Sequence, residues 1–204
     1  LLSLRYTVKI SGAEKLKGVK GALVLPNHPA EMDPVLLVAH LWPRLRFRPV
    51  ALEDYYHAPV IGPIIQAIGA IPVPDMDYGG GRYKRMRIEK GTVEAEEALR
   101  HVTSLLFYPS GLLMGSGLEM LKGSSGVHRL MHAAEEFPVV LVHTRGLWGS
   151  SFSRAYTGES PNFVAMGLRA LKYVLKNFIF FSPRRHVVIE ISVFSTSKFT
   201  QMDV

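Results

Sequence analysis

The chain has 204 residues, of which 48% are hydrophobic, and this size predicts a single domain over residues 1–204 with a substantial core. It contains no cysteine, which excludes disulfide bonds, cysteine-ligated zinc and a thiol nucleophile. The formal net charge of +7 predicts an anionic partner: nucleic acid, an acidic membrane face or a phosphorylated ligand. Because no RNA-binding, helix-turn-helix or zinc-finger signature is visible, nucleic acid is the weakest of the three.

The two ends of the chain suggest a piece of a longer protein. The sequence begins at Leu1 without a signal peptide and stops two residues after Met202, just beyond a predicted strand. No apolar run reaches the roughly 18 residues needed to cross a bilayer. The nearest, Phe163–Phe181, is interrupted by three basic residues. We therefore expect an excised domain without a bilayer-spanning segment among these residues.

Two strands open the chain. Alternating apolar residues predict the first over Tyr6–Ile10, and a continuous apolar run predicts a more buried one over Ala22–Leu25. Polar residues and prolines follow directly, so the second strand leads into a loop.

His28 and Asp33 lie in this loop, five positions apart. Pro29 keeps His28 out of helical geometry, and Asp33 before Pro34 is typical of an N-cap in front of a helix that we expect to end near Leu41. In a tight loop the carboxylate can fold back onto one imidazole nitrogen, which fixes the tautomer and leaves the other nitrogen to take a proton. The alternative is that Asp33 is only a cap and His28 only a polar loop residue.

Basic residues follow. Arg44, Arg46 and Arg48 alternate with apolar residues at the start of a predicted strand, which indicates either a charged edge strand or contact with a phosphate or a membrane. Residues 58–69 predict a short apolar helix, followed by a short strand and a glycine-rich loop over 75–81.

A long helix is predicted over Arg82–Arg100, because its apolar residues roughly follow the 3.6-residue period. Its first turns are basic. Arg82 and Arg85 there are candidates for binding a phosphate group, and a solvated helix face is the alternative.

The next buried strand, Ser104–Tyr108, runs into Pro109, Ser110 and Gly111. The chain lacks the Gly-x-Ser-x-Gly elbow that carries the nucleophilic serine of many hydrolases, so Ser110 is a poor candidate for a nucleophile. We expect it to be a polar residue that lines a pocket.

His128 and His132 lie four positions apart on a helix predicted over 125–136, a spacing that a metal site can use. No third ligand of obvious position accompanies them, so we expect no metal.

The last elements complete an alternation of strands and helices. Strands are predicted over Pro138–His143 and Val187–Val193, and the helix predicted over Pro161–Phe181 suits either a membrane interface or packing on a core sheet. The alternation predicts an α/β layered fold with a central mixed sheet flanked by helices.

The segment Asn27-His28-x4-Asp33-Pro34, directly after a buried strand, strongly resembles the first motif of the glycerolipid acyltransferase family, of the lysophosphatidic acid acyltransferase type. The apolar strand after Pro138 resembles the fourth motif. In that family the histidine is the general base and the aspartate its partner, so the resemblance implies these roles for His28 and Asp33. It also implies the family's glycerol-3-phosphate acyltransferase-like fold, with a mostly parallel sheet.

The second and third family motifs are only partly kept. The second usually ends in an arginine that grips the acceptor's phosphate, and residues 73–75 read Val-Pro-Asp there. The third, Pro-Glu-Gly-Thr-Arg, corresponds to residues 109–113, in which a serine and two leucines replace the glutamate, threonine and arginine. The family uses these polar residues to hold the acceptor, so their loss weakens the assignment of the acceptor more than that of the reaction.

The resemblance implies transfer of a fatty acyl group from acyl-CoA or an acyl carrier protein to a hydroxyl of a lysophospholipid-like or other lipid acceptor. Backbone N–H groups near Gly111 are candidates to stabilise the oxyanion. The expected substrate-binding residues are Asn27, Tyr108, Pro109, Ser110, Gly111, Arg82 and Arg85.

The expected partners are the acyl donor, a lipid acceptor and, through a peripheral contact, the cytoplasmic face of a membrane. We expect no metal, no nucleic acid and no cofactor besides the acyl thioester co-substrate. Two other functions stay open: a lipid-binding or membrane-docking domain that has kept the fold without activity, and hydrolysis of acyl thioesters with water in the acceptor's place.

Overall fold

The computed structural model describes residues 2–59, 61–75, 81–121, 125–133, 136–156, 158, 168, 171–172, 175 and 184–196. The strands are β1 (Tyr6–Ser11), β2 (Leu23–Pro26), β3 (Arg48–Leu52), β4 (Ile71–Val73), β5 (Leu105–Leu106), β6 (Pro138–Arg145) and β7 (Arg185–Ser195). The helices are α1 (Leu2–Arg5), the 3-10 helix η1 (Ala13–Leu16), α2 (Asp33–Leu45), α3 (Glu53–Tyr56), α4 (Ile61–Ala67), α5 (Arg82–Arg100) and α6 (Ser125–Met131).

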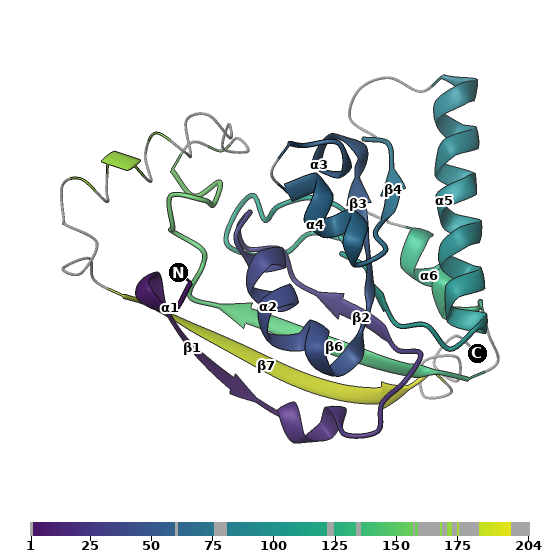
Figure 1. Ribbon diagram of the computed structural model, residues 1–204, viewed down its shortest axis with the longest axis horizontal. Coiled ribbons are helices and arrows are strands. Elements are labelled where there is room, and N and C mark those ends of the chain that lie inside the picture. The colour runs from purple at the N-terminus through teal and green to yellow at the C-terminus, as the bar shows by residue number, and fades with distance from the viewer. Residues whose placement is uncertain are drawn as a thin grey trace.

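The described strands form one mixed sheet in the order β1-β7-β6-β2-β5-β3-β4 (Figure 1). Every neighbouring pair is parallel except β6 and β7, which are antiparallel. This arrangement confirms the predicted α/β fold with a mixed, mostly parallel sheet. The central strand β2 is buried along its whole length, as expected of a parallel strand covered on both faces.

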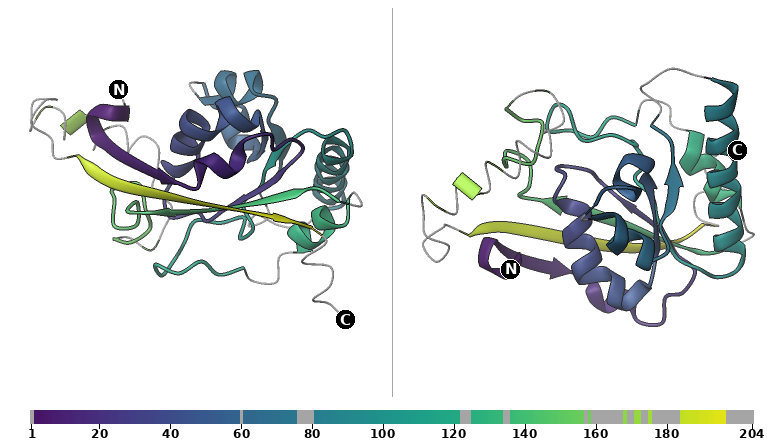
Figure 2. Two further views of the ribbon diagram at one scale, coloured as in Figure 1. Left: turned by 90° about the horizontal axis from the view of Figure 1, so that it is seen from below. Right: turned by 45° about the horizontal axis from the view of Figure 1, so that its top comes forward.

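Successive side chains of β2 point to opposite faces of the sheet, and helices cover both faces. Val24 belongs to a core cluster that includes Leu37 of α2, whereas Leu23 belongs to a second cluster that includes Leu99 of α5 and Leu130 of α6. Seen along the sheet, α2 lies on one side and α6 on the other (Figure 2, left). The fold therefore has three layers.

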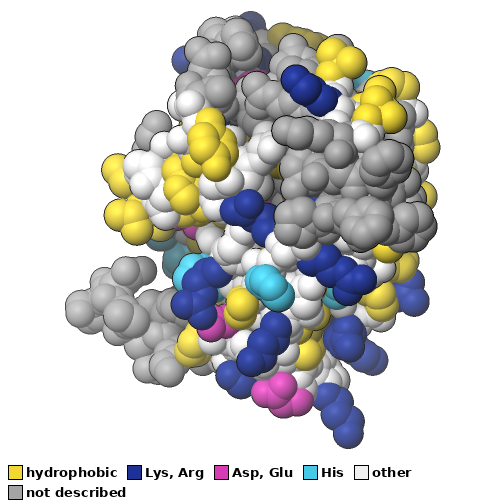
Figure 3. All heavy atoms as spheres, turned by 90° about the vertical axis from the view of Figure 1, so that its left-hand side faces the viewer, with side chains coloured by type: hydrophobic (Ala, Val, Ile, Leu, Met, Phe, Trp, Pro, Cys, Tyr) yellow, Lys and Arg dark blue, Asp and Glu magenta, His cyan; other side chains and the backbone are white. Residues whose placement is uncertain are grey.

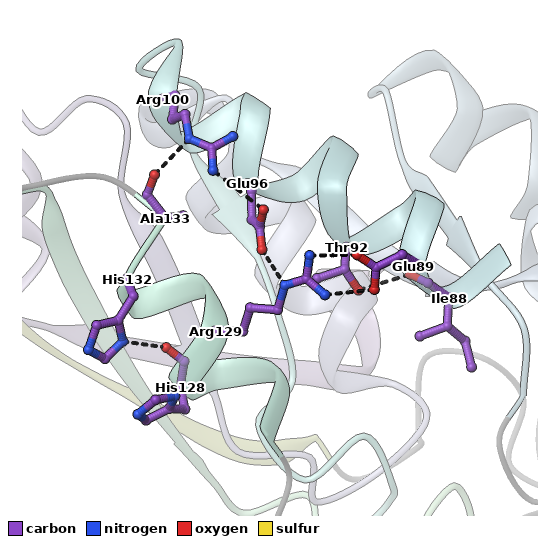
Figure 4. A network of polar contacts seen from close by, with 9 residues as sticks. All are labelled: Ile88, Glu89, Thr92, Glu96, Arg100, His128, Arg129, His132 and Ala133. Atoms are coloured by element: carbon purple, nitrogen blue, oxygen red, sulfur yellow. Dashed lines mark hydrogen bonds and ion pairs between the residues drawn. The ribbon is translucent and has the colours of Figure 1, made fainter. Parts of the chain in front are cut away.

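A network of ion pairs joins α5 to α6 (Figure 4). Arg129 of α6 donates to both carboxylate oxygens of Glu89, at 2.7 and 2.8 Å, and also pairs with Glu96. Nearby, His132 Nδ1 lies 2.8 Å from the carbonyl oxygen of His128. Within the described ranges no three potential metal ligands come together.

Helix α2 is longer than the sequence suggested. It continues through Pro43 to Leu45 and ends at Arg46 in a left-handed conformation with φ of 48°. A proline inside a helix removes one backbone hydrogen bond. The burial of Leu41 and Leu45 in the core offsets that loss, so the prediction of an end near Leu41 is wrong.

Arg44, Arg46 and Arg48, which we expected on one strand, therefore belong to different elements. Arg44 lies in the last turn of α2 and donates to the carbonyl of His40 at 2.8 Å, and Arg46 caps the helix. Only Arg48 belongs to β3, where it pairs with Glu94 and donates to the carbonyl of Gly69 at 2.6 Å. The alternating basic face of that strand does not form.

Other bounds shift by a few residues. Strand β5 is shorter than the predicted 104–108, α6 ends at Met131 instead of near 136, and β6 extends to Arg145. The helix predicted over 161–181 and the glycine-rich loop over 75–81 fall largely outside the described residues. Among the residues that are described, no helix has the length and apolar character of a membrane span.

Candidate active site

Three loops meet where parallel strands β2, β5 and β6 end, the edge at which open α/β sheets place their ligands. The loop after β2 carries His28, the loop after β5 carries Tyr108 and Ser110, and the loop after β6 begins beyond Arg145. Backbone hydrogen bonds tie the loops together: Met114 N–H donates to the carbonyl of His28 at 2.9 Å, and Glu31 N–H to that of Phe152 at 2.9 Å.

His28, Asp33 and Tyr108 form a connected chain of side chains. Nδ1 of His28 lies 3.1 Å from Oδ2 of Asp33, and the Tyr108 hydroxyl donates to Oδ1 of the same carboxylate at 2.8 Å. The Tyr108 ring also stacks on the imidazole, with ring centroids 4.2 Å apart and planes 29° apart. Because Asp33 is fully buried, both carboxylate oxygens find their partners inside the protein.

Asp33 is the first residue of α2, and Met32 is the N-cap. The expectation that Asp33 caps the helix is therefore wrong by one position. The difference matters chemically, because the carboxylate turns toward His28 instead of bonding the helix's own N–H groups. Burial raises the pKa of Asp33 above its ordinary value, and the neighbouring His28, the bond from Tyr108 and the N-terminal end of the helix, which favours a negative charge, oppose that rise.

The charges around His28 favour its protonated form. Burial lowers the pKa of His28, but the carboxylates of Asp33, Glu31 and Glu119 outweigh burial and raise the pKa above its ordinary value of 6.5. Burial and the neighbouring Asp33 raise the pKa of Tyr108 well above its ordinary value of 10, so the phenol stays protonated and acts as a donor. With Asp33 ionised, the proton of neutral His28 lies on Nδ1, and Nε2 carries the free lone pair.

Two carboxylates of this site were missed in the sequence. Glu31 lies inside the histidine loop, where the Tyr55 hydroxyl donates to it at 2.9 Å, and burial raises its pKa. Glu119 lies in the segment after β5, and its Oε1 is 2.8 Å from Oγ of Ser110. The position of Glu31 between His28 and Asp33 was a usable signal, but nothing in the sequence pattern linked Glu119 to this loop.

Asn27 uses its side chain to join two strands. Its Nδ2 donates to the carbonyl of Thr144 at 3.0 Å, and its Oδ1 accepts from Thr144 N–H at 2.7 Å. The amide thus extends the β2–β6 ladder beyond the end of β2 and fixes the start of the histidine loop. We expected the Asn27 side chain to contact substrate, and in the structure it bonds to the backbone of Thr144.

Pro109, Ser110 and Gly111 form a tight turn next to His28. Gly111 has φ of 63°, and its N–H donates to the carbonyl of Tyr108 at 3.0 Å. A positive φ suits glycine because it has no Cβ. The Gly111 N–H is therefore engaged within the turn, and in this conformation it is not available to an oxyanion.

Arg82 and Arg85 lie apart from these loops, at the exposed start of α5. Helix α5 packs against β4 and β5 at the flank of the sheet (Figure 1). In the described part of the chain, no hydrogen bond or ion pair connects either arginine side chain to the histidine loop. Arg87, two residues further on, pairs with Glu53 at 2.6 Å.

Comparisons with known proteins agree with this fold. The sequence model of the family described as Acyltransferase matches residues 7–144, which is more than half of the chain and includes the loops after β2 and β5 and all but the last residue of β6. A comparison with curated proteins found no match.

Among solved structures, the chain is similar to the 1-acyl-sn-glycerophosphate (LPA) acyltransferase PlsC from Thermotoga maritima. The two share 15% sequence identity with a TM-score of 0.65, over 98% of this chain and 69% of that chain. The match confirms the fold. With the family match over residues 7–144, it identifies the chain as a member of the acyltransferase family, whose enzymes transfer acyl groups in lipid metabolism.

Proposed function

We propose that this enzyme moves a fatty acyl group from acyl-CoA or an acyl carrier protein to a hydroxyl of a lysophospholipid-like or other lipid acceptor, with His28 as general base and Asp33 as its partner. One observation carries the proposal: Nδ1 of His28 lies 3.1 Å from a fully buried carboxylate that Tyr108 also holds. An imidazole oriented in this way has one nitrogen free for proton transfer.

In the proposed reaction, Nε2 of His28 removes the proton of the acceptor hydroxyl as its oxygen attacks the thioester carbonyl. The tetrahedral intermediate collapses by breaking the carbon–sulfur bond, and the proton on His28 passes to the departing thiolate. Asp33 stabilises the imidazolium that forms between these steps. The products are an acylated acceptor and a free thiol, and the reaction needs no cofactor besides the acyl thioester.

The proposal is tested by thiol release from a panel of acyl-CoAs and acyl carrier proteins, each offered with several lipid acceptors. We expect release that depends on the acceptor, and the panel then names donor and acceptor. Release without an acceptor would instead indicate a thioesterase. No thiol release with any donor or acceptor would favour a lipid-binding domain without activity.

Tyr108→Phe is expected to lower kcat/KM about tenfold, because a hydrogen bond to a charged group contributes roughly 1.5–3 kcal/mol. The substitution keeps the ring stacked on His28 and removes only the hydroxyl that holds Oδ1 of Asp33. Tyr83→Phe, at an exposed position of α5, is the matched control and is expected to leave kcat/KM unchanged. An unchanged kcat/KM for Tyr108→Phe would show that this hydroxyl does not position the pair.

Glu31→Gln is expected to shift the acid limb of the kcat/KM profile to lower pH. His28 acts as a base only when neutral, so activity falls as the pH drops through its raised pKa. The Glu31 carboxylate contributes to raising that pKa, and its removal lowers the pKa, although the charges of Asp33 and Glu119 remain. The measurement is kcat/KM against pH, with Glu89→Gln on α5 as control. A limb that stays in place or moves to higher pH contradicts the assignment.

We also propose a peripheral contact with the cytoplasmic face of a membrane. Leu118, Met120 and Leu121 are exposed by 73, 61 and 56%, on the same segment as Glu119, which bonds to Ser110 beside His28. The net charge of +7 suits anionic lipids. Figure 3, which faces the end of the molecule where α1 lies, shows several Lys and Arg side chains, most of them in the lower half of the view, with few acidic ones among the coloured residues.

Replacing Leu118, Met120 and Leu121 together by Gln is expected to weaken binding to vesicles of phosphatidylcholine and phosphatidylglycerol by at least about tenfold, because apolar area then leaves the lipid. Cosedimentation measures the bound fraction. The control replaces Tyr83, Met86 and Val102, three exposed apolar residues on or directly after α5, by Gln. Equal binding of both triple variants would rule out this segment as the lipid contact.

A further inference from the structure

Glu119 brings a carboxylate to the loop from which the family's usual glutamate is missing. Ser110 stands at that motif position, and its Oγ lies 2.8 Å from Oε1 of Glu119 and 2.9 Å from the carbonyl oxygen of Leu112. Glu119 lies nine positions further along the chain and is partly buried. A carboxylate is therefore present at this loop, but it comes from a different position in the sequence.

The arginine of that motif has no counterpart at its own position. Leu113, which stands where the family has arginine, is buried in the protein. Arg82 and Arg85 lie at the exposed start of α5, without a contact to these loops among the described residues. Among the described residues, the ionisable groups that act on Glu119 are His28, Asp33 and His143, and Glu31, next to His28, interacts in turn with Arg154.

This distribution of charge distinguishes between acceptor heads. Burial raises the pKa of Glu119 above its ordinary value, while the bond to Ser110 and the nearby His28 oppose that rise. In its ionised form the carboxylate accepts hydrogen bonds and offers none, so it binds hydroxyl or ammonium groups well. A phosphate monoester carries up to two negative charges and needs donors or cations. Placed next to the ionised carboxylate of Glu119, it would be repelled at short range, because like charges repel strongly inside a protein.

We propose that Glu119 is a specificity-determining residue, which selects an acceptor whose head presents hydrogen-bond donors beside His28 and disfavours one that presents a phosphate monoester there. This inference rests on the proposed acyl transfer and names the class of its acceptor. The recognised chemistry is an N–H or O–H donor, which a polyol hydroxyl or an ammonium group supplies.

The test compares kcat/KM for three acceptors with one fixed acyl donor: a monoacylglycerol, lysophosphatidylethanolamine and lysophosphatidate. Wild type is expected to favour the first two over lysophosphatidate. Glu119→Gln keeps the shape and the bond to Ser110 but removes the charge, so the ratio of kcat/KM for lysophosphatidate to that for monoacylglycerol is expected to rise about tenfold. Glu89→Gln, the same change on α5, is expected to leave the ratio unchanged.

The ratio isolates acceptor choice from other effects. A change in the pKa of His28, or a loss of folded protein, alters the rates with all three acceptors alike. A larger loss for lysophosphatidylethanolamine than for monoacylglycerol in Glu119→Gln would identify ammonium as the preferred donor, and equal losses would identify hydroxyls.

Transfer by wild type that favours lysophosphatidate, with a ratio that Glu119→Gln leaves unchanged, would overturn this inference while the acyltransferase stands. If wild type releases no thiol with any acceptor, both the proposed function and this inference fail.

Discussion

Replacing His28 by Ala is expected to reduce acceptor-dependent thiol release by at least about 10³-fold, because a positioned general base contributes roughly 10²–10⁴ to a rate. The ring is only 15% exposed and its Nδ1 is bonded to Asp33, so no solvent base takes its place readily. The fold is expected to persist, since the core clusters on both faces of the sheet do not include this side chain.

The matched control for this prediction is His132→Ala. His132 is exposed on the turn after α6, and its described contacts are with His128, through the carbonyl oxygen and the ring. We expect full activity and an unchanged melting temperature for this variant. Activity of His28→Ala within about tenfold of wild type, an effect too small for loss of a general base, would remove His28 from the chemistry.

Asp33→Asn is expected to cost about 10²–10⁴ in kcat, although the fold remains. The Tyr108 hydroxyl continues to donate to the amide oxygen, so the amide NH₂ turns toward Nδ1 of His28. Nδ1 must then accept, which moves the ring proton to Nε2 and leaves the acceptor hydroxyl without a base. Asp33 thus controls which nitrogen of His28 carries the proton.

Thermal unfolding separates this electronic effect from damage to the fold. Asp33→Asn keeps its hydrogen bonds and removes a buried charge, so we expect stability at least equal to wild type. Asp33→Ala leaves the buried Tyr108 hydroxyl without its acceptor, which costs about 1–3 kcal/mol. The double variant His28→Ala, Asp33→Asn is expected to be no less active than His28→Ala alone, because the two residues act as one unit. Additive losses would show that they act independently.

Much of the fold could be predicted from the sequence because its strands carry distinct patterns. The continuous apolar run at Ala22–Leu25 indicated a more buried strand than the first, and β2 lies at the centre of the sheet. The helix predicted over Arg82–Arg100 has those bounds in the structure. The end of α2 was wrong because tertiary burial of Leu45 outweighs the local effect of Pro43, and a sequence pattern does not report that balance.

The site was only partly predictable for a similar reason. The short spacing between His28 and Asp33 indicated their contact, because a tight loop limits where the carboxylate can go. The contacts of Tyr108 with Asp33 and of Glu119 with Ser110 depend on how the loop after β5 packs against the loop after β2. Arg82 and Arg85 were predicted from the charge pattern alone, and their role stays a prediction: they lie at the exposed start of α5, without a described contact to these loops.

The most direct test of the central claim is the balance of products. Wild type and His28→Ala would each be given an acyl thioester with and without the best acceptor, and the free thiol, acylated acceptor and free fatty acid would be quantified together. We predict one acylated acceptor for each thiol released by wild type, little free fatty acid, and neither product from His28→Ala. Free fatty acid formed in step with the thiol, or equal product from both proteins, would contradict transfer by a His28–Asp33 base.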